Sequence, residues 1–333
     1  MKNRVEALVY IESKSTNPYY NLALEEYVFS QMDSNESYFM LWQNTNTIVV
    51  GKYQNTQEEI NQEAVEKNGI RVVRRLSGGG AVYHDEGNLN FTFIVSKDGN
   101  REFDFSIFVK PIIKALEELG VQAEFTGRND ITINGLKISG NSQYIKNNRV
   151  LHHGCIMLDS NLDRVRDALN VRDAKFDSRS VKSVRSRVTT INEHAPRRIT
   201  MDEFKEAIKR NVFLDSQVKE YCLTEDDQAQ IERLEKEKYS TWDWNYGFSK
   251  EYSVRREKKF ESGLVIVDMD VKQGRIEDIR ITGDFFGNSD IDKLQEMMIG
   301  LNLDDNLKHN LEKIDIAGFI HGIGPEELLG LLR

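Results

Sequence analysis

The sequence feature that most constrains the fold is the dipeptide Asn134-Gly135, which separates two short runs of alternating apolar and polar residues. A two-residue type I′ hairpin turn needs positive φ at both central positions, which Asn followed by Gly readily adopts. Folding the chain about this turn predicts four cross-strand pairs: Ile133 with Leu136, Thr132 with Lys137, Ile131 with Ile138, and Asp130 with Ser139.

The two faces of this predicted hairpin differ in chemistry, because side chains alternate between faces along a strand. One face carries only apolar residues, Ile131, Ile133, Leu136 and Ile138. The other carries only polar residues, Asp130, Thr132, Lys137 and Ser139. We therefore expect the apolar face to lie in a core and the polar face to be solvated, with Lys137 presented there, diagonal to Asp130.

The composition describes an ordinary protein with a substantial core. The chain has 333 residues, 39% of them hydrophobic and 30% charged, and its length predicts two domains. The formal net charge of −9 argues against nonspecific binding to nucleic acid. The sequence shows neither a membrane-spanning apolar run nor a signal peptide, and its two cysteines are too far apart for a CxxC motif. These features favour a reducing cytoplasm.

Helices and strands alternate through the first two-thirds of the chain. Asn17 before Pro18 predicts a helix start, and Thr200 with Glu203 has the spacing of a capping box. Strands are expected at 38–42, 47–50, 70–76, 81–83, 90–95 and 151–158, and helices at 105–119, 162–169 and 225–237. A boundary is predicted after residue 247, where the charged stretch KEYSVRREKKFES suits a linker. Beyond it, we expect a hairpin over 264–281 and a terminal helix from Pro325.

Two arginines and three glycines adjoin in the segment Arg74 to Gly80. Both the P-loop pattern and the dinucleotide-binding pattern are missing from this segment. Three glycines mark either a flexible turn or a close approach of the backbone to a ligand. Since neighbouring strand residues face opposite ways, we expect one arginine to point at the glycines while the other is solvated. Guanidinium beside backbone N–H groups would form an anion cradle.

Two other positions have both structural and functional interpretations. Lys137 could be a solvated strand lysine paired with Asp130, but the polar residues crowded around the hairpin favour a binding role. His153 and Cys155 share one face of a strand. A Cys–His nucleophile pair is conceivable there, although a small core residue is the more ordinary role for Cys155. The basic run over 172–187 is either a solvated loop or a segment that meets phosphates or an acidic protein.

With these motifs established, the sequence resembles lipoate–protein ligases. The resemblance rests on RRLSGGGAVYHDEGNLNF, GRNDITINGLKISGNSQY, HHGCIMLD and KSVRSRVTTIN. The tail, with KKFESGLVIVDMDV and IEDIRITGDFFG, resembles the accessory C-terminal domain of the longer, bacterial-type enzymes. These motifs are jointly specific and cover nearly the whole chain.

The resemblance implies an α/β (α+β) fold. Residues 1–247 would form a mixed-sheet catalytic domain of the biotin/lipoate ligase type, and residues 248–333 a small α+β accessory domain. The implied enzyme activates lipoate with ATP and Mg²⁺ to lipoyl-AMP. It then transfers the lipoyl group to a lysine of apo lipoyl domains of 2-oxoacid dehydrogenase E2 subunits or of glycine cleavage H protein. A cytoplasmic monomer that acts without nucleic acid or membrane fits this picture.

The resemblance also assigns roles residue by residue. Lys137 matches the essential catalytic lysine, which would touch both the lipoate carboxylate and the α-phosphate. The lipoate-binding positions would be Arg75, Ser77, His153 and Gly154. The nucleotide-binding positions would be Gly80, Val82, Tyr83, Asn88, Asn129, Asp130, Lys137 and Lys182, with Asp130 as the magnesium-linked carboxylate.

Two other functions are alternatives to the ligase. Cys155 stands where ligases often have Thr or another small residue, which leaves open an ATP-independent octanoyl or lipoyl acyltransferase acting between carrier proteins. A thioester on Cys155 or Cys222 would distinguish it. The other alternative, a non-catalytic cofactor-binding or regulatory protein, is opposed by the presence of Arg75 and Lys137 beside an intact glycine segment. A biotin ligase fits less well, since its arginine- and glycine-rich loop is missing from the sequence.

Overall fold

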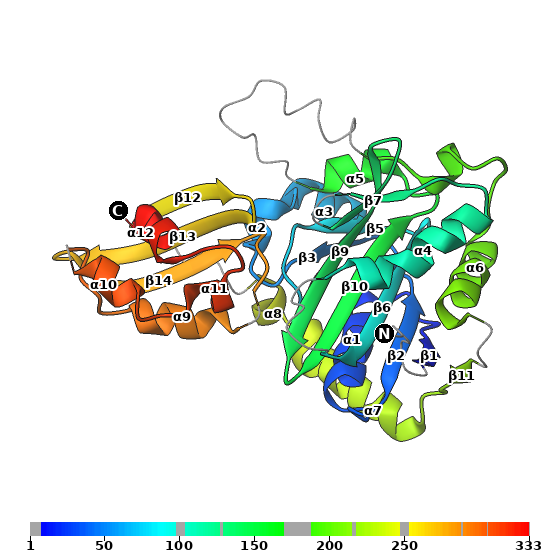
Figure 1. Ribbon diagram of the computed structural model, residues 1–333, viewed down its shortest axis with the longest axis horizontal. Helices are drawn as coiled ribbons and strands as arrows, with labels where there is room; N and C mark the ends of the chain where they lie inside the picture. Colours follow the sequence, from blue (N-terminus) through cyan, green and yellow to red (C-terminus); the bar gives the residue numbers. More distant parts are fainter. Residues whose placement is uncertain are drawn as a thin grey trace, which may run out of the picture.

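The computed structural model describes residues 8–97, 104–126, 129–169, 188–214, 218–246, 253–287, 289–304 and 306–332. Figure 1 shows a larger unit, built from the first three-quarters of the chain, beside a smaller C-terminal unit. Lys182 and the rest of the basic run over 172–187 lie outside the described residues. No helix within the described ranges is long and apolar enough to cross a membrane.

The larger unit contains eleven of the described strands and most of the helices. Its strands are β1 (Leu8–Glu12), β2 (Ser37–Trp42), β3 (Thr47–Val50), β4 (Arg71–Arg74), β5 (Val82–His84), β6 (Asn88–Ser96), β7 (Glu124–Thr126), β8 (Asp130–Ile133), β9 (Leu136–Lys146), β10 (Arg149–Met157) and β11 (Lys219–Glu220). Its helices are α1 (Pro18–Ser30), α2 (Thr56–Glu59), α3 (Gln62–Asn68), α4 (Ser106–Glu118), α5 (Leu162–Ala168), α6 (Met201–Phe213), α7 (Glu225–Leu234) and α8 (Trp242–Tyr246). A 3₁₀ turn, η1 (Ile191–Glu193), and a π-helical segment, η2 (Glu235–Tyr239), complete it.

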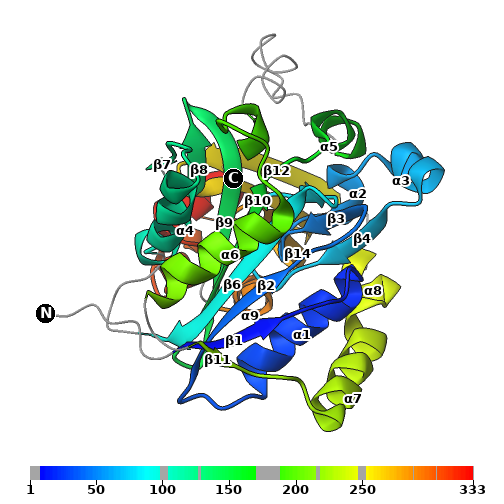
Figure 2. The same ribbon diagram turned by 90° about the vertical axis from the view of Figure 1, so that its right-hand side faces the viewer.

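The main sheet has eight strands in the order β11-β1-β2-β6-β10-β9-β8-β7, with parallel pairs at β11-β1-β2 and antiparallel pairs elsewhere. Helices α4 and α6 cover one face, and α1 and α7 cover the other (Figure 2). In β2, Phe39 and Leu41 join the core under α4 and α6, while Met40 and Trp42 join the core under α1. Both faces are therefore buried, which explains why this strand is hydrophobic from Tyr38 to Trp42.

A second, three-stranded sheet has the order β4-β3-β5, with β4 parallel and β5 antiparallel to β3. Its own small core contains Ile48, Val50, Val72 and Tyr83. The arginine–glycine segment begins at the end of β4, and it lies against the interior strands β9 and β10 of the main sheet, where Ser142 Oγ donates to the carbonyl oxygen of Gly78 at 2.8 Å. The mixed α/β fold class and the mixed sheets predicted for the larger unit are confirmed.

The smaller unit consists of a three-stranded antiparallel sheet and four short helices. The elements are β12 (Val254–Phe260), β13 (Gly263–Lys272), β14 (Arg275–Gly283), α9 (Ile291–Met298), α10 (Leu307–Leu311), α11 (Ile316–Phe319) and α12 (Pro325–Leu332). The predicted hairpin over 264–281 and the terminal helix are confirmed, with positive φ at Gln273 and Gly274 in the turn. The linker prediction is wrong over Val254–Phe260, because this charged stretch is the edge strand β12.

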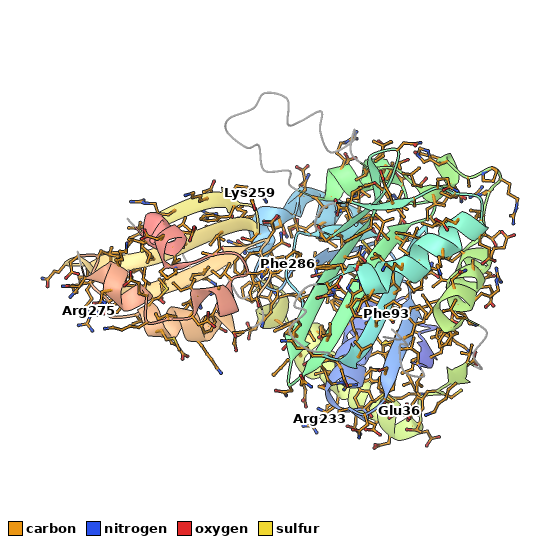
Figure 3. The ribbon with its side chains drawn as sticks, viewed as in Figure 1. Glu36, Phe93, Arg233, Lys259, Arg275 and Phe286 are labelled. Atoms are coloured by element: carbon orange, nitrogen blue, oxygen red, sulfur yellow. The ribbon has the colours of Figure 1, made fainter. Side chains whose placement is uncertain are left out.

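The two units meet beside the glycine segment. The ring of Tyr53 stacks on that of Phe285 at 4.8 Å between centroids. The backbone N–H of Gly79 donates to the carbonyl oxygen of Phe285 at 3.4 Å. Figure 3 places Phe286 at this junction, and its ring lies 5.9 Å from that of Phe105. The smaller unit thus contacts the loop that borders the cavity described below.

The predicted hairpin forms, but its register changes after two pairs. Asn134 and Gly135 both have positive φ, and the first two pairs are as expected. An irregularity between Ile131 and Thr132 then pairs Ile131 with Ser139, so the pairs predicted for Ile138 and Asp130 are wrong. Such a bulge inserts one extra residue and re-aims the strand. The expected solvated face is also partly wrong, because Ser139 is buried.

Candidate active site

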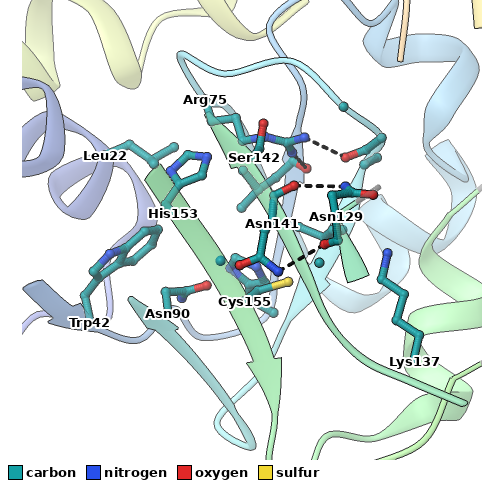
Figure 4. A pocket seen from close by; sticks show the side chains of 18 residues that line it. Leu22, Trp42, Arg75, Asn90, Asn129, Lys137, Asn141, Ser142, His153 and Cys155 are labelled. Carbon is teal, nitrogen blue, oxygen red and sulfur yellow. Dashed lines mark hydrogen bonds between the residues drawn. The ribbon is translucent and has the colours of Figure 1, made fainter. Parts of the chain in front are cut away.

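One cavity brings most of the predicted site residues together (Figure 4). The predicted residues that line it are Arg75, Gly80, Val82, Asn129, Lys137, His153 and Gly154. Four others, Ser77, Tyr83, Asn88 and Asp130, are not part of the lining. Of these four, Tyr83 packs in the core of the smaller sheet and its hydroxyl donates to Asn46 Oδ1.

Lys137 stands at one end of the cavity, on β9 just before the bulge. Its Nζ lies 2.7 Å from Oδ1 of Asp130, and both side chains are 35% exposed. The diagonal pairing expected from the sequence is therefore present. An ion pair this exposed is weak, so an arriving phosphate or carboxylate can replace Asp130 as the partner of the ammonium group.

Arg75 organises the glycine segment from a buried position. Its guanidinium donates to the carbonyl oxygens of Gly78 at 2.7 Å, Gly80 at 2.9 Å and Val49 at 3.2 Å. Burial lowers the pKa of Arg75 to about 10, so it still carries a positive charge at neutral pH. Gly79 within this loop has a φ of 89°, which explains the need for glycine at that position. The triplet is thus a fixed loop rather than a flexible turn.

Arg74, the neighbour of Arg75, is fully buried, so the expectation that one arginine would be solvated is wrong. Its Nη1 donates to the carbonyl oxygens of Gly51 and Gln54, and its Nε donates to that of Trp244. Nη2 donates to Thr56 Oγ1. Burial lowers the pKa of Arg74 to about 9. Arg74 therefore joins the loop after β3 to helix α8, which lies far away in the sequence.

A buried relay of hydrogen bonds supports the opposite end of the cavity. His153 Nδ1 lies 2.9 Å from Glu25 Oε1, and its Nε2 lies 2.6 Å from Ser77 Oγ. Since a carboxylate only accepts, Nδ1 carries a hydrogen and Nε2 can accept from the Ser77 hydroxyl. The same Ser77 oxygen accepts from Arg75 Nε at 3.1 Å. Thr92 Oγ1 donates to the same Glu25 oxygen, Oε1, at 2.7 Å, which gives the carboxylate a second donor.

The middle of the cavity is shaped by two asparagines and a glycine. The side-chain amide of Asn129 donates to the backbone carbonyl oxygen of Asn141 at 2.9 Å, and that of Asn141 donates to the backbone carbonyl oxygen of Asn129 at 3.0 Å. A Cβ atom at Gly154 would lie 2.5 Å from Asn141 Oδ1 and 2.6 Å from the Phe91 ring. Only glycine fits at this position. The strand therefore passes close to the Asn129–Asn141 pair without closing the cavity.

Cys155 lines the cavity on the same face of β10 as His153, as the strand alternation predicts. Burial raises the pKa of its thiol. A cysteine nucleophile reacts as the thiolate, so this environment disfavours that role. Among the described residues, no group of three or more His, Cys, Asp or Glu side chains could hold a metal ion.

Several residues of the site were missed by the sequence analysis. The lining also contains Leu22, Trp42, Val49, His84, Asn90 and Ser142. His84 had a signal, since it follows Val82 by two residues and therefore shares its strand face. Glu25 had a weaker one, an acidic residue within the apolar helix LALEEYVF. Trp42 and Leu22 had none, because an apolar residue that lines a cavity looks like one that fills a core.

Comparison with known proteins identifies the class. Residues 17–213 match the sequence profile of the Lipoyl protein ligase A/B catalytic domain, and residues 249–332 match that of the Bacterial lipoate protein ligase C-terminus. The mixed α/β fold and the cavity between its sheets thus belong to an enzyme of the ligase class.

Two named relatives are similar in sequence to this chain over nearly its full length. The chain is 46% identical over 318 residues to lipoate–protein ligase 1 of Staphylococcus aureus, covering 95% of this chain and 97% of that protein. It is 42% identical over 330 residues to the lipoate–protein ligase LplJ of Bacillus subtilis, covering 98% of this chain and 100% of that protein. The chain therefore belongs to the lipoate–protein ligase family, as its sequence motifs predicted.

Solved structures support the same fold. P. falciparum LipL1 in complex with lipoate superposes with a TM-score of 0.78 at 23% identity, over 98% of both chains. Lipoate–protein ligase A bound with ATP gives a TM-score of 0.62 at 26% identity, over 73% of this chain and 99% of that chain. The bipartite lipoate–protein ligase of Thermoplasma acidophilum, studied together with its E2 lipoyl domain, gives a TM-score of 0.65 at 28% identity, over 74% of this chain and 98% of that chain.

Proposed function

We propose that this enzyme is an ATP-dependent lipoate–protein ligase that forms lipoyl-AMP and passes the lipoyl group to a lysine of a carrier domain. The observation that carries the proposal is the arrangement of the cavity. Lys137 stands at one side, and Leu22, Trp42 and His153 stand at the other (Figure 4). A carboxylate held near Lys137 would place an apolar chain toward Trp42. Lipoate has this combination of an acid group and an apolar tail.

In the first step, a carboxylate oxygen of lipoate attacks the α-phosphorus of ATP, and the bond to pyrophosphate breaks. Negative charge gathers between the carboxylate and the phosphate as they approach. The ammonium group of Lys137 neutralises this charge when it leaves Asp130 for the substrates, and electrostatic stabilisation of this kind is often the largest catalytic term. Arg75 holds the carbonyl groups of the glycine segment, so that this wall of the cavity is fixed in advance.

In the second step, the amine of an acceptor lysine attacks the carbonyl carbon of lipoyl-AMP. The bond from that carbon to the phosphate oxygen breaks, AMP leaves, and the amine loses its proton. Lys137, still beside the mixed anhydride, stabilises the developing oxyanion and the departing phosphate. The partly exposed position of Lys137 supports this role, because the acceptor lysine has to arrive from outside.

The nucleotide is proposed to lie at the Lys137 end. Of the proposed nucleotide contacts, Gly80, Val82 and Asn129 line the cavity, whereas Asn88 does not line it and donates to Asn90 Oδ1 at 3.2 Å. The further nucleotide contacts inferred from the family resemblance are Tyr83, Asp130 and Lys182. The Asp130 carboxylate fits a magnesium ion brought in with ATP, since Mg²⁺ bound to phosphates uses only one or two protein carboxylates. The ion would supply further neutralisation of the phosphate charge.

For lipoate, the proposed contacts are Arg75, Ser77, His153 and Gly154. We further propose that residues 1–247 form the catalytic domain and residues 248–333 the accessory domain. The acceptors are apo lipoyl domains of 2-oxoacid dehydrogenase E2 subunits, glycine cleavage H protein, or both. The enzyme would act as a monomer in the cytoplasm.

The test is incubation with lipoate, with or without ATP and magnesium, in the presence of a panel of apo lipoyl domains and H protein. Intact-mass spectrometry should show one added lipoyl group on an acceptor lysine, and only when ATP is present. Failure to modify any acceptor would contradict the proposal. A parallel reaction without ATP supplies an octanoyl- or lipoyl-carrier protein in place of free lipoate. Transfer from that carrier to an acceptor lysine would instead favour the acyltransferase, and a thioester on Cys155 would then be expected.

A further inference from the structure

His84 is a buried histidine at the end of the cavity beside Trp42, where the apolar tail of lipoate is proposed to lie. We call this end the tail end. Its ring lines the cavity and stands edge-on to Trp42, with 6.4 Å between ring centroids. His84 Nδ1 lies 3.2 Å from Asn44 Nδ2. His84 Nε2 is buried and has no hydrogen-bond partner among the residues that the structure describes. A buried polar atom without a partner is costly, so this one calls for an explanation.

The neighbours of His84 determine which of its nitrogens carries the hydrogen. Asn21 Nδ2 faces the carbonyl oxygens of Ser15 at 3.0 Å and Gln43 at 2.8 Å, which can only accept. The same amide lies 3.0 Å from Asn44 Oδ1. Asn44 therefore turns its oxygen toward Asn21 and its NH₂ group toward His84. Nδ1 of His84 has to accept, which leaves the hydrogen of the neutral ring on Nε2.

The ring is neutral under ordinary conditions. Burial, with smaller contributions from Arg75 and His153, lowers the pKa of His84 to about 3. At neutral pH the side chain thus offers one N–H donor, at Nε2, and that donor has no acceptor within the described protein. Asn90, whose backbone is paired with that of Trp42, also lines the cavity and has a buried Nδ2 without a partner in the described ranges.

We propose that His84 Nε2–H recognises the sulfur atoms of the dithiolane ring and thereby makes the enzyme prefer lipoate to a purely hydrocarbon acid of the same shape. The inference rests on the proposed function, which places the acid group at Lys137 and the tail beside Trp42. Sulfur is a weak but real acceptor. A CH₂ group in its place would leave the buried donor unpaired, and sites built to hydrogen-bond a substrate reject analogues that lack the acceptor.

The experiment compares three acids in one assay: lipoate, octanoate and 5-cyclopentylpentanoate, in which the two sulfurs of lipoate are replaced by CH₂ groups. The ratio of kcat/KM values for lipoate and the cyclopentyl acid measures recognition of sulfur apart from ring shape. In the unaltered enzyme we expect a ratio of about three to ten, the effect of one modest hydrogen bond. His84→Phe should bring this ratio close to one.

His152→Phe is the matched control. His152 is also buried and its Nε2 also lacks a partner among the described residues, but it does not line the cavity. It should leave the ratio unchanged. An unchanged ratio in His84→Phe, with activity retained, would overturn the inference. Lack of activity of the unaltered enzyme with every acid would instead contradict the proposed function.

A measurement on the unaltered protein covers the case in which His84→Phe does not fold. With ¹⁵N-labelled histidine, the Nε2–H resonance of His84 should shift when lipoate binds and shift much less with the cyclopentyl acid. Equal shifts with both acids would contradict recognition of sulfur, as would a nitrogen chemical shift showing that Nε2 carries no hydrogen.

Discussion

The two ends of the cavity are built in opposite ways. At the tail end, Glu25 and His153 are buried, and their hydrogen bonds run through Ser77 to Arg75. At the other end, Lys137 is one-third exposed and has a single ion pair to Asp130. The buried end is rigid before any substrate arrives. At the open end the ammonium group of Lys137 stays accessible. This suits a reaction in which it leaves Asp130 for the substrates of the first step and then stabilises the charges that develop in the second. Mutations at the two ends should therefore affect different properties.

The largest effect is expected from Lys137→Ala. It removes the charge that offsets the approaching carboxylate and phosphate, so lipoate-dependent exchange of pyrophosphate into ATP should fall by about 10²–10³-fold. The free energy of unfolding should change by less than about 1 kcal/mol, because the ion pair with Asp130 is exposed. Retention of more than a tenth of the exchange rate would contradict the catalytic role, and a large loss of stability would remove the contrast between the two ends.

Glu25→Ala tests the buried end. It leaves the hydrogens of His153 Nδ1 and Thr92 Oγ1 without their acceptor, so urea denaturation should show a loss of about 2–4 kcal/mol in the free energy of unfolding. The KM for lipoate should rise more than kcat falls, because the relay shapes the cavity without touching the reacting atoms. Glu25→Gln keeps one acceptor oxygen and should recover part of both losses. A kcat effect as large as that of Lys137→Ala would contradict this division of roles.

Acid should destabilise the protein through the buried histidines. Burial lowers the pKa of His84 from 6.5 to about 3 and lowers that of His152 well below its ordinary value. Between pH 6.5 and 3 the unfolded chain binds protons that the folded chain does not. The free energy of unfolding should therefore fall as pH decreases through this window, by up to about 1.4 kcal/mol per pH unit for each histidine. Urea midpoints at pH 7 and 5 measure this slope, and His84→Phe and His152→Phe should each flatten it.

The smallest effect is expected from Cys155→Ala. Cys155 lines the cavity between the two ends, and burial raises the pKa of its thiol, so the ligase reaction does not need it. Pyrophosphate exchange and lipoyl transfer should stay within about threefold of the unaltered rates, the range of a minor packing change. Complete loss of transfer, with exchange retained, would indicate an acyl-thioester intermediate and revive the acyltransferase mechanism.

The open end of the site was easier to predict from sequence than the buried end. The Asn134-Gly135 turn and the alternation around it placed Lys137 beside Asp130, because both signals are local. The bulge that follows was not predictable, because the sequence keeps its alternation of apolar and polar residues almost unchanged at that point. For this reason Ser139 was expected on a solvated face and lies buried instead.

Long-range packing explains the other errors. Arg74 is buried because Trp244 and Asn245, some 170 positions away in the sequence, supply acceptors for it. Glu25 is buried because Thr92 and His153 meet it from the main sheet. Neither partnership leaves a local pattern. The strand β12 was mistaken for a linker because edge strands often carry charges, which discourage pairing with other chains.

The most direct test of the account is a crystal structure of the enzyme with lipoyl-AMP or a non-hydrolysable analogue. We expect Lys137 Nζ to leave Asp130 and to lie within hydrogen-bonding distance of the α-phosphate, with the dithiolane ring beside Trp42 and His84. An adenylate bound elsewhere, or a Lys137 that stays paired with Asp130 while the acyl chain lies outside the cavity, would contradict it.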